Sequence, residues 1–246
     1  MLSLLKQHPF AVEAFFEQSL VFTFAVPKDQ LTKLIPECLQ LDTFEDWAFI
    51  AVAMVQTKSL RPKGFPKVFG NDFFLIGYRV FVRYVTSEGK RLRGLYILKS
   101  ETDKKKMETF GNIFTQYKYT TTDIHLTNEN GSTKIDSTKS DFSVEVEFRD
   151  SDKIDLPVGS PFSNWKDARK FAGPLPFTFT FDQQTNNVLI IEGVRENWNP
   201  IPVKVIDYRF SFIDNLNLRE VKLANAFVIQ NIPYYWKKGK IDRWKK

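Results

Sequence analysis

Residues 93–127 read RGLYILKSETDKKKMETFGNIFTQYKYTTTDIHLT and contain, in order, the patterns of a strand, a helix and a second strand. Residues 93–99 are apolar and rich in side chains that fit a pleated surface. In residues 103–114, Met107, Phe110 and Phe114 are spaced three and four apart, which places them on one face of a helix. Residues 117–126 are again aromatic and β-branched, in an alternating pattern. The stretch therefore predicts a short helix between two strands.

The rest of the chain predicts further strands and short helices, in total about ten strands and three or four helices. Residues 142–148 alternate strictly between apolar and polar, so one face of that strand is expected to be buried. No linker or internal repeat divides the chain. The further strands are expected at residues 20–26, 47–55, 73–85, 142–148, 177–181, 188–192, 203–213 and 221–230, with helices at 27–35 and 163–172.

These patterns predict an α+β protein that is mainly β. We expect a single domain, residues 1–236, built on a curled antiparallel sheet or cone-shaped β-barrel with a few short peripheral helices. Curling or closure would remove exposed sheet edges. The 43% hydrophobic content and the 24 phenylalanines supply a core, with material left to line a cavity. A barrel of this size can enclose a ligand.

The composition of the chain bears on its cellular compartment. No apolar run approaches the roughly 20 residues of a membrane-spanning helix, and residues 1–18 lack the pattern of a signal peptide. A single cysteine, Cys38, excludes intrachain disulfides. We therefore expect a cytoplasmic protein without a membrane span.

Most of the net charge of +6 lies at the C-terminus. Residues 237–246 hold six basic residues and one acid, a net +5, so the other 236 residues carry only +1. We interpret 237–246 as a basic tail with solubilising charge and predict no nucleic-acid partner. The alternative is a tail that binds an anionic surface, aided by the aromatic residues 234–236.

The sequence contains few patterns that indicate a known chemistry. The two histidines and one cysteine have no zinc-site spacing, and no glycine-rich phosphate loop is present. We therefore predict neither a metal nor a cofactor. Lysine chemistry remains, because burial lowers the pKa of an amine and frees it to attack a carbonyl. Lys118 is the candidate, and in a regular strand the alternation predicts that it points inward while Tyr117 and Tyr119 point outward. A β-bulge that swaps the two sides and a solvent-facing strand lysine are the alternatives.

Other residues are candidates for binding a ligand. Arg79 and Arg83 lie four apart on one strand face, and an arginine inside a barrel would bind a carboxylate with two hydrogen bonds. Surface ion pairs are the alternative for both. Arg195 stands where a charged strand end meets a proline-containing loop, either at a pocket mouth or in a surface ion pair. Tyr96 and Tyr119 complete the candidate binding set.

Several motifs occur in the order found in one family. The chain resembles the uncharacterised bacterial branch of the acetoacetate decarboxylase-like superfamily, from the start to about Trp236. The resemblance implies a cone-shaped β-barrel around a small cavity. The motifs are His8-Pro9-Phe10, Val26-Pro27 with Leu31 and Leu34-Ile35-Pro36, Leu60-Arg61-Pro62-Lys63-Gly64, Arg79-Val80-Phe81-Val82, Arg93-Gly94-Leu95-Tyr96 and residues 168–177 (ARKFAGPLPF).

The resemblance also implies which positions would carry a decarboxylase site. True acetoacetate decarboxylases form an imine with a lysine beside a second lysine, and a glutamate and an arginine complete their pocket. Here Tyr117 takes the imine-forming position and Lys118 the neighbouring one. The regions expected to hold the glutamate and the arginine, residues 73–75 and 17–19, contain neither. We therefore do not predict acetoacetate decarboxylation.

Two functions remain open from the sequence. The first is a small-molecule pocket protein that acts on a carbonyl or carboxylate metabolite in a lyase-like manner. Lys118 would be its nucleophile or cation, Tyr117 or Tyr119 its proton donor, and Arg79 the anchor of an anion. The second is a non-catalytic binding module for a hydrophobic or acidic metabolite. The sequence leaves open whether the protein is an enzyme, and it is compatible with a homo-oligomer.

Overall fold

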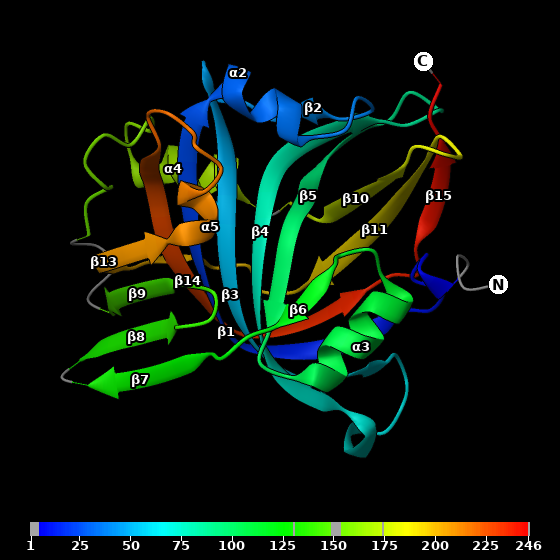
Figure 1. Cartoon of the computed structure of the whole chain (residues 1–246), viewed down its shortest axis with the longest axis horizontal. Coiled ribbons are helices and arrows are strands. Elements are labelled where there is room, and N and C mark those ends of the chain that lie inside the picture. The colour runs from blue at the N-terminus through cyan, green and yellow to red at the C-terminus, as the bar shows by residue number, and fades with distance from the viewer. Residues whose placement is uncertain (1–4, 130, 149–153, 174, 246) are drawn as a thin grey trace.

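The computed structural model describes residues 5–129, 131–148, 154–173 and 175–245 (Figure 1). Strands account for most of its regular structure, as predicted. Its elements are β1 (Val12–Pro27), α2 (Lys28–Leu31), the 3-10 helix η1 (Thr32–Leu34), β2 (Gln40–Leu41), β3 (Trp47–Pro62), the 3-10 helix η2 (Lys67–Phe69), β4 (Asn71–Val85), β5 (Arg91–Thr102), α3 (Lys105–Phe114), β6 (Tyr119–Thr121), β7 (His125–Glu129), β8 (Ser132–Ser137), β9 (Phe142–Glu147), α4 (Trp165–Ala172), β10 (Phe177–Asp182), β11 (Asn187–Arg195), β12 (Ile201–Pro202), β13 (Lys204–Phe210), α5 (Ser211–Asp214), β14 (Lys222–Trp236) and β15 (Lys240–Arg243).

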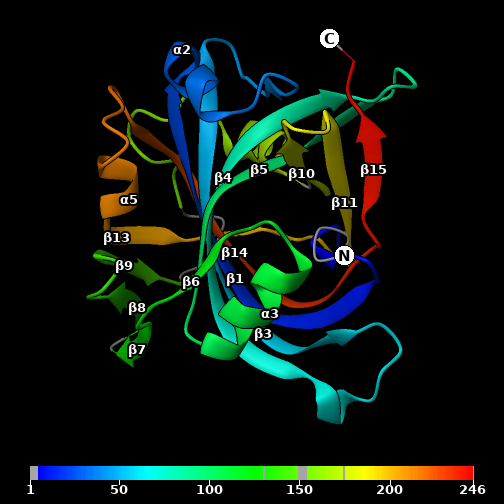
Figure 2. The ribbon, with the colours of Figure 1, turned by 45° about the vertical axis from the view of Figure 1, so that its right-hand side comes forward.

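The main sheet curls until its strands close a ring. Its order is β12-β14-β1-β3-β4-β5-β10-β11-β15, and β14 also pairs with β11. Seven strands, β14, β1, β3, β4, β5, β10 and β11, therefore form a continuous circuit, whose curvature is visible in Figures 1 and 2. The predicted curled sheet with short helices around it is confirmed.

The sheet is mixed rather than purely antiparallel. Strand β10 runs parallel to β5, and β6 also runs parallel to β5. A parallel neighbour needs a long crossover. The chain has one in α3, between β5 and β6, and another in the segment that contains β7–β9 and α4, between β5 and β10.

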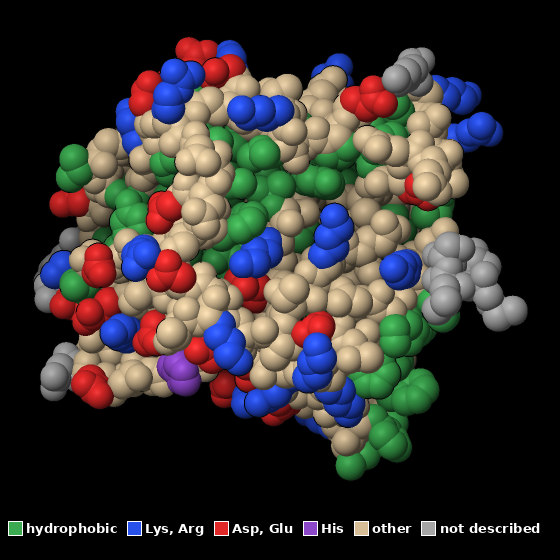
Figure 3. Space-filling view, viewed as in Figure 1, with side chains coloured by type: hydrophobic (Ala, Val, Ile, Leu, Met, Phe, Trp, Pro, Cys, Tyr) green, Lys and Arg blue, Asp and Glu red, His purple; other side chains and the backbone are tan. Residues whose placement is uncertain are grey.

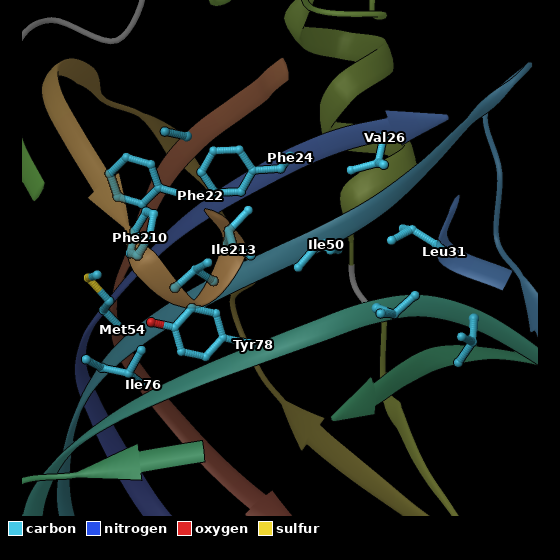
Figure 4. Close-up of a cluster of buried hydrophobic side chains, with 14 of the residues drawn as sticks. Phe22, Phe24, Val26, Leu31, Ile50, Met54, Ile76, Tyr78, Phe210 and Ile213 are labelled. Atoms are coloured by element: carbon cyan, nitrogen blue, oxygen red, sulfur yellow. The ribbon is translucent and has the colours of Figure 1, made fainter. Parts of the chain in front are cut away.

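The long central strands are buried on both faces, which explains their nearly continuous apolar runs. Phe22, Met54 and Tyr78 point to one side of the sheet, where they form a core with Phe210 and Ile213 (Figure 4). The rings of Phe22 and Phe210 lie 5.6 Å apart, edge to face. This side is covered by a second sheet, in the order β13-β9-β8-β7, and by α5.

The other side of the same strands faces the inside of the ring. A second cluster of buried residues lies there, separate from the first. Phe49 on β3 stacks on Phe162 with ring centroids 5.5 Å apart, and Phe171 on α4 packs 4.9 Å from Phe49. Aromatic side chains thus fill this end of the ring, and α4 packs against it.

The segment expected to be a solvated tail belongs instead to the sheet. Strand β15 pairs with β11 over four residues. The carboxylate of Asp242 accepts hydrogen bonds from the Tyr84 hydroxyl at 2.6 Å and from Ser87, and Trp244 packs on Phe181. Strand β15 pairs with the edge of β11 that β10 leaves free. The backbone hydrogen bonds of this ladder and those of Asp242 hold the segment against the sheet, although most of its side chains are basic.

Two local predictions are also corrected. The strand expected at 117–126 is divided into β6 and β7, and Lys118, just before β6, has a left-handed backbone with φ of 53°. Helix α4 is capped by Asn164, whose side chain accepts a hydrogen bond from the Asp167 backbone N–H at 3.0 Å, rather than by Ser163. An asparagine is as good a cap as a serine, so the sequence alone does not choose between adjacent candidates.

The surface carries both signs of charge. Figure 3 shows Lys and Arg side chains interspersed with Asp and Glu over one face, with hydrophobic side chains gathered at its centre and lower edge. In the described part of the chain, no helix is long and apolar enough to cross a membrane. The described residues also contain no cluster of His, Cys, Asp and Glu that could hold a metal ion.

Candidate functional site

A cavity of about 120 Å³ lies inside the ring, and we call it the arginine cavity. It exists because the inner faces of neighbouring strands carry small residues. Ser19 lies on β1, Ala51 and Ala53 lie on β3, and Gly77 lies opposite Ala53 in the β3–β4 ladder. Ala51 lies opposite Arg79. These small side chains leave the space into which the side chain of Arg79 extends.

Arg79 projects from β4 into the cavity and has no counter-ion among the described residues. Its guanidinium covers Gly77 so closely that a Cβ on that glycine would lie 2.8 Å from Nε. Nε is buried and has no hydrogen-bond partner in the described structure. Burial lowers the pKa of the guanidinium, and the phenols of Tyr234, Tyr119 and Tyr117 act in the opposite direction. An arginine stays protonated in proteins, so Arg79 places a positive charge in the cavity.

Arg195, at the end of β11, supplies a second positive charge. Its Cζ lies 4.0 Å from the centre of the Trp198 ring and 5.8 Å from that of Tyr234, both within cation–π range. Its Nε and one terminal nitrogen are buried without a hydrogen-bond partner among the described residues. Burial lowers its pKa, Tyr234 opposes this, and Arg79 lowers the pKa further because the two like charges are close.

Tyrosine side chains complete the polar lining. Asn112 on α3 holds the backbone of Tyr119, accepting from its N–H at 2.8 Å and donating to its carbonyl at 2.9 Å. The Tyr119 ring lies directly against Gly111 of the same helix. Burial raises the pKa of Tyr119 to about 12, and Arg79 opposes this. Burial and Tyr119 raise the pKa of Tyr117 as well. Both phenols therefore stay protonated and can donate hydrogen bonds to a ligand.

Four of the six candidate residues line this cavity. Arg79, Tyr117, Tyr119 and Arg195 come from three distant parts of the chain and share one lining. For Arg79 and Arg195, the alternative of a surface ion pair does not hold.

Lys118 and Tyr96 do not line the cavity. Lys118 is exposed, and together with Tyr96 it lines a groove on the outside of the ring. Tyr117 and Tyr119 line both this groove and the arginine cavity, so they form the wall between the two. The expected orientation of residues 117–119 is therefore reversed. Tyr119 pairs with Ser100 of β5, which faces the cavity, so the tyrosines point inward and the lysine points outward.

Sequence reasoning missed three contributors to the cavity. Trp198 and Tyr234 hold Arg195 between aromatic rings, and Gly77 makes room for Arg79. Tyr234 was interpreted only as part of an aromatic segment before the basic tail. A glycine inside a strand signals the close approach of another group, and this signal at Gly77 pointed to the site.

The lining sets the chemistry that this space can perform. Among the described residues that line the cavity, none is Asp, Glu, Lys, His or Cys. No amine is available there to form an imine, and no carboxylate or imidazole is available to act as a general base. What remains is two cations, three phenols, a few hydroxyls and apolar walls, a set suited to holding an anion.

The fold defines a class of protein, because solved structures with the same arrangement are acetoacetate decarboxylases and related enzymes. An acetoacetate decarboxylase from Legionella pneumophila has a TM-score of 0.64 at 11% identity, with 95% of this chain and 87% of that chain covered. An acetoacetate decarboxylase-like enzyme from Sphingomonas wittichii RW1 has a TM-score of 0.56 at 10% identity, with 98% and 94% covered. The enduracididine biosynthesis enzyme MppR complexed with pyruvate has a TM-score of 0.53 at 11% identity, with 95% and 90% covered.

The chain belongs to the family DUF2071, whose model, described as "Uncharacterized conserved protein (COG2071)", matches residues 14–231. No curated protein matches the chain significantly. The shared fold is the one that the resemblance to the acetoacetate decarboxylase-like superfamily implied. At these identities the solved structures establish the fold alone.

Proposed function

We propose that this protein binds a small carboxylate metabolite in the arginine cavity, without forming a covalent bond to it. The observation that carries the proposal is the pair of guanidinium groups, Arg79 and Arg195, that share one cavity without an acidic partner among the described residues. Burying an unpaired charge costs several kcal/mol. A ligand carboxylate would offset this cost and would accept hydrogen bonds from the nitrogens that are unpartnered.

The size of the cavity limits the ligand. A volume of about 120 Å³ corresponds to roughly four water molecules at about 30 Å³ each. A short-chain acid with a few carbon atoms matches this volume, whereas a nucleotide or a fatty acid exceeds it.

The tyrosines favour an acid that also carries a carbonyl oxygen. Tyr117 and Tyr119 are protonated donors beside Arg79. A 2-oxo or 3-oxo acid would place its carboxylate on the arginine and its carbonyl oxygen near a phenol. The similar fold of MppR, solved with pyruvate, supports the same class of ligand by analogy.

The absence of a lining lysine among the described residues favours binding over imine chemistry. Lys118 lies on the opposite side of the wall formed by Tyr117 and Tyr119. Of the two functions left open by the sequence, the binding module for an acidic metabolite is therefore the one we propose.

Isothermal titration calorimetry with pyruvate and acetoacetate tests the proposal, with methyl pyruvate as the uncharged comparison. The acids are expected to bind and the ester is not. Arg79→Met is expected to weaken binding at least about 30-fold, since losing a buried charged partner costs about 2 kcal/mol or more. Arg91→Met, which removes an exposed charge at the start of β5, is the matched control and should leave affinity unchanged.

The pH dependence gives a second readout. Affinity is expected to stay constant from pH 6 to 9, because guanidinium groups do not titrate there and burial holds the pKa of Tyr119 near 12. Borohydride added with acetoacetate is expected to trap no lysine adduct. Equal binding of acid and ester, or a trapped adduct, would contradict the proposal.

A further inference from the structure

A second pocket of about 440 Å³ adjoins the arginine cavity, and we call it the outer pocket. It is bounded by α4, by residues 198–202 and by β14 at Asn225. Ala172, Trp198 and Phe227 line both the outer pocket and the arginine cavity. The two spaces are therefore neighbours on either side of these three side chains.

The outer pocket contains a buried amide without partners. Asn225 is only 1% exposed, yet neither its side-chain nitrogen nor its side-chain oxygen has a hydrogen-bond partner in the described part of the chain. Buried polar groups in folded proteins nearly always have partners. Asn225 therefore indicates that a group absent from this chain supplies them.

Two neighbouring polar groups are also buried without a hydrogen-bond partner among the described residues. Thr23 lies directly opposite Asn225 in the β1–β14 ladder, and its hydroxyl is buried and unpartnered among the residues described. The indole N–H of Trp198, on the shared wall, is likewise buried and unpartnered there. Unpartnered groups thus line the route from the arginine cavity to the outer pocket.

The chemistry of these groups selects the kind of ligand group that fits them. Asn225 presents a donor and an acceptor side by side, and Trp198 adds a donor. A primary amide matches this set, because its N–H₂ donates to the asparagine oxygen while its carbonyl oxygen accepts from the two donors. A carboxylate would leave the asparagine oxygen unpaired, and an apolar group would leave all three groups unpaired.

We propose that the ligand is a carboxylate that carries a primary amide at its far end, with the carboxylate on Arg79 and the amide on Asn225. This inference rests on the proposed function and adds a second recognition point to it. The wall residue Trp198 then contributes to both ends of the site, since its ring carries Arg195 and its N–H faces the amide.

The test uses pairs of acids that differ only by N–H₂ in place of a methyl group. The pairs are succinamate with 4-oxopentanoate, glutaramate with 5-oxohexanoate, and adipamate with 6-oxoheptanoate. Calorimetry on the full-length protein is expected to show at least about tenfold tighter binding of the amide in the pair of matching length, since leaving a buried polar group unpaired costs about 1–3 kcal/mol.

Variants assign the preference to its residue. Asn225→Leu, of similar volume, should abolish the amide preference, because the keto acid then loses one hydrogen bond and the amide loses two. Trp198→Phe should reduce the preference while keeping an aromatic ring on Arg195. Gln230→Leu, at an exposed position on the same strand, is the control and should change neither.

The outcomes separate this inference from the proposed function. If both members of every pair bind equally and Arg79→Met abolishes binding, the amide subsite is wrong and the carboxylate site stands. The subsite is also wrong if Asn225→Leu keeps the preference. If none of the acids binds in an Arg79-dependent manner, both proposals are wrong.

Discussion

Replacing Arg79 by methionine is expected to stabilise the ligand-free protein even though it removes a buried side chain. Methionine fills a similar volume and carries no charge, so the substitution removes an unpaired cation and an unpartnered N–H. Leaving a buried donor unpaired costs about 1–3 kcal/mol. We therefore expect the free energy of unfolding to rise by about 2 kcal/mol, which corresponds to roughly 4–8 °C in Tm for a chain of this size.

The matched control is the same substitution at Arg93 on the adjacent strand β5. Arg93 lies 2.6 Å from Asp42, a carboxylate with no exposed surface, so Arg93→Met leaves only Arg83 to pair with it. Removing one partner of a buried charge is destabilising. The two variants are thus expected to shift Tm in opposite directions, as measured by thermal and urea unfolding without ligand.

The result that refutes this reasoning is a loss of stability in Arg79→Met comparable with that in Arg93→Met. Such a loss would mean that the folded protein already satisfies the Arg79 guanidinium, and the argument for a ligand carboxylate would lose its basis. A rise in Tm together with a loss of carboxylate binding would instead identify Arg79 as a residue maintained for function at the expense of stability.

Two further predictions concern the support of the site and the C-terminal strand. Gly77→Ala should displace the Arg79 guanidinium, because the new Cβ would lie 2.8 Å from Nε. The affinity for a carboxylate should fall about tenfold while Tm changes little. An unchanged affinity would contradict the placement of Arg79. Asp242→Ala should lower Tm, because the Tyr84 hydroxyl loses the hydrogen bond that it donates to Asp242 at 2.6 Å. Leaving that hydroxyl unpaired costs about 1–3 kcal/mol. An unchanged Tm would restore the interpretation of residues 237–246 as a tail.

The sequence predicted the strands and helices well because burial on both faces leaves a clear signal. Long apolar runs such as residues 47–55 have few alternatives to a central strand. The closure of the sheet depends on the pairing of β14 with β11, between segments about 40 residues apart. The sequence pattern of either strand does not encode that contact, so periodicity alone could not decide between an open curled sheet and a closed ring.

The composition of the site was predictable in part for a different reason. Arg79 shares a strand face with Phe81, and that pattern left an inward position and a surface ion pair both open; in the structure both side chains line the cavity. The face of Tyr117 and Tyr119 was not predictable, because both faces of residues 117–122 carry partly polar side chains. Thr122, just after β6, is buried and hydrogen-bonds with the hydroxyls of Ser137 and Ser140, so a polar residue in this segment is no sign of solvent.

The geometry of the cavity is maintained by glycines as much as by the polar residues themselves. Each of four glycines lies against one lining side chain at a distance where no Cβ fits. A Cβ added at Gly77 would lie 2.8 Å from Arg79, and one added at Gly173 would lie 2.8 Å from Trp198. A Cβ at Gly111 or Gly193 would overlap Tyr119 or the Tyr234 hydroxyl. These glycines thus make room for one cation and three aromatic rings of the cavity lining. Among the described residues, the cavity lining contains no lysine, which agrees with the proposal that the cavity binds an anion without imine formation.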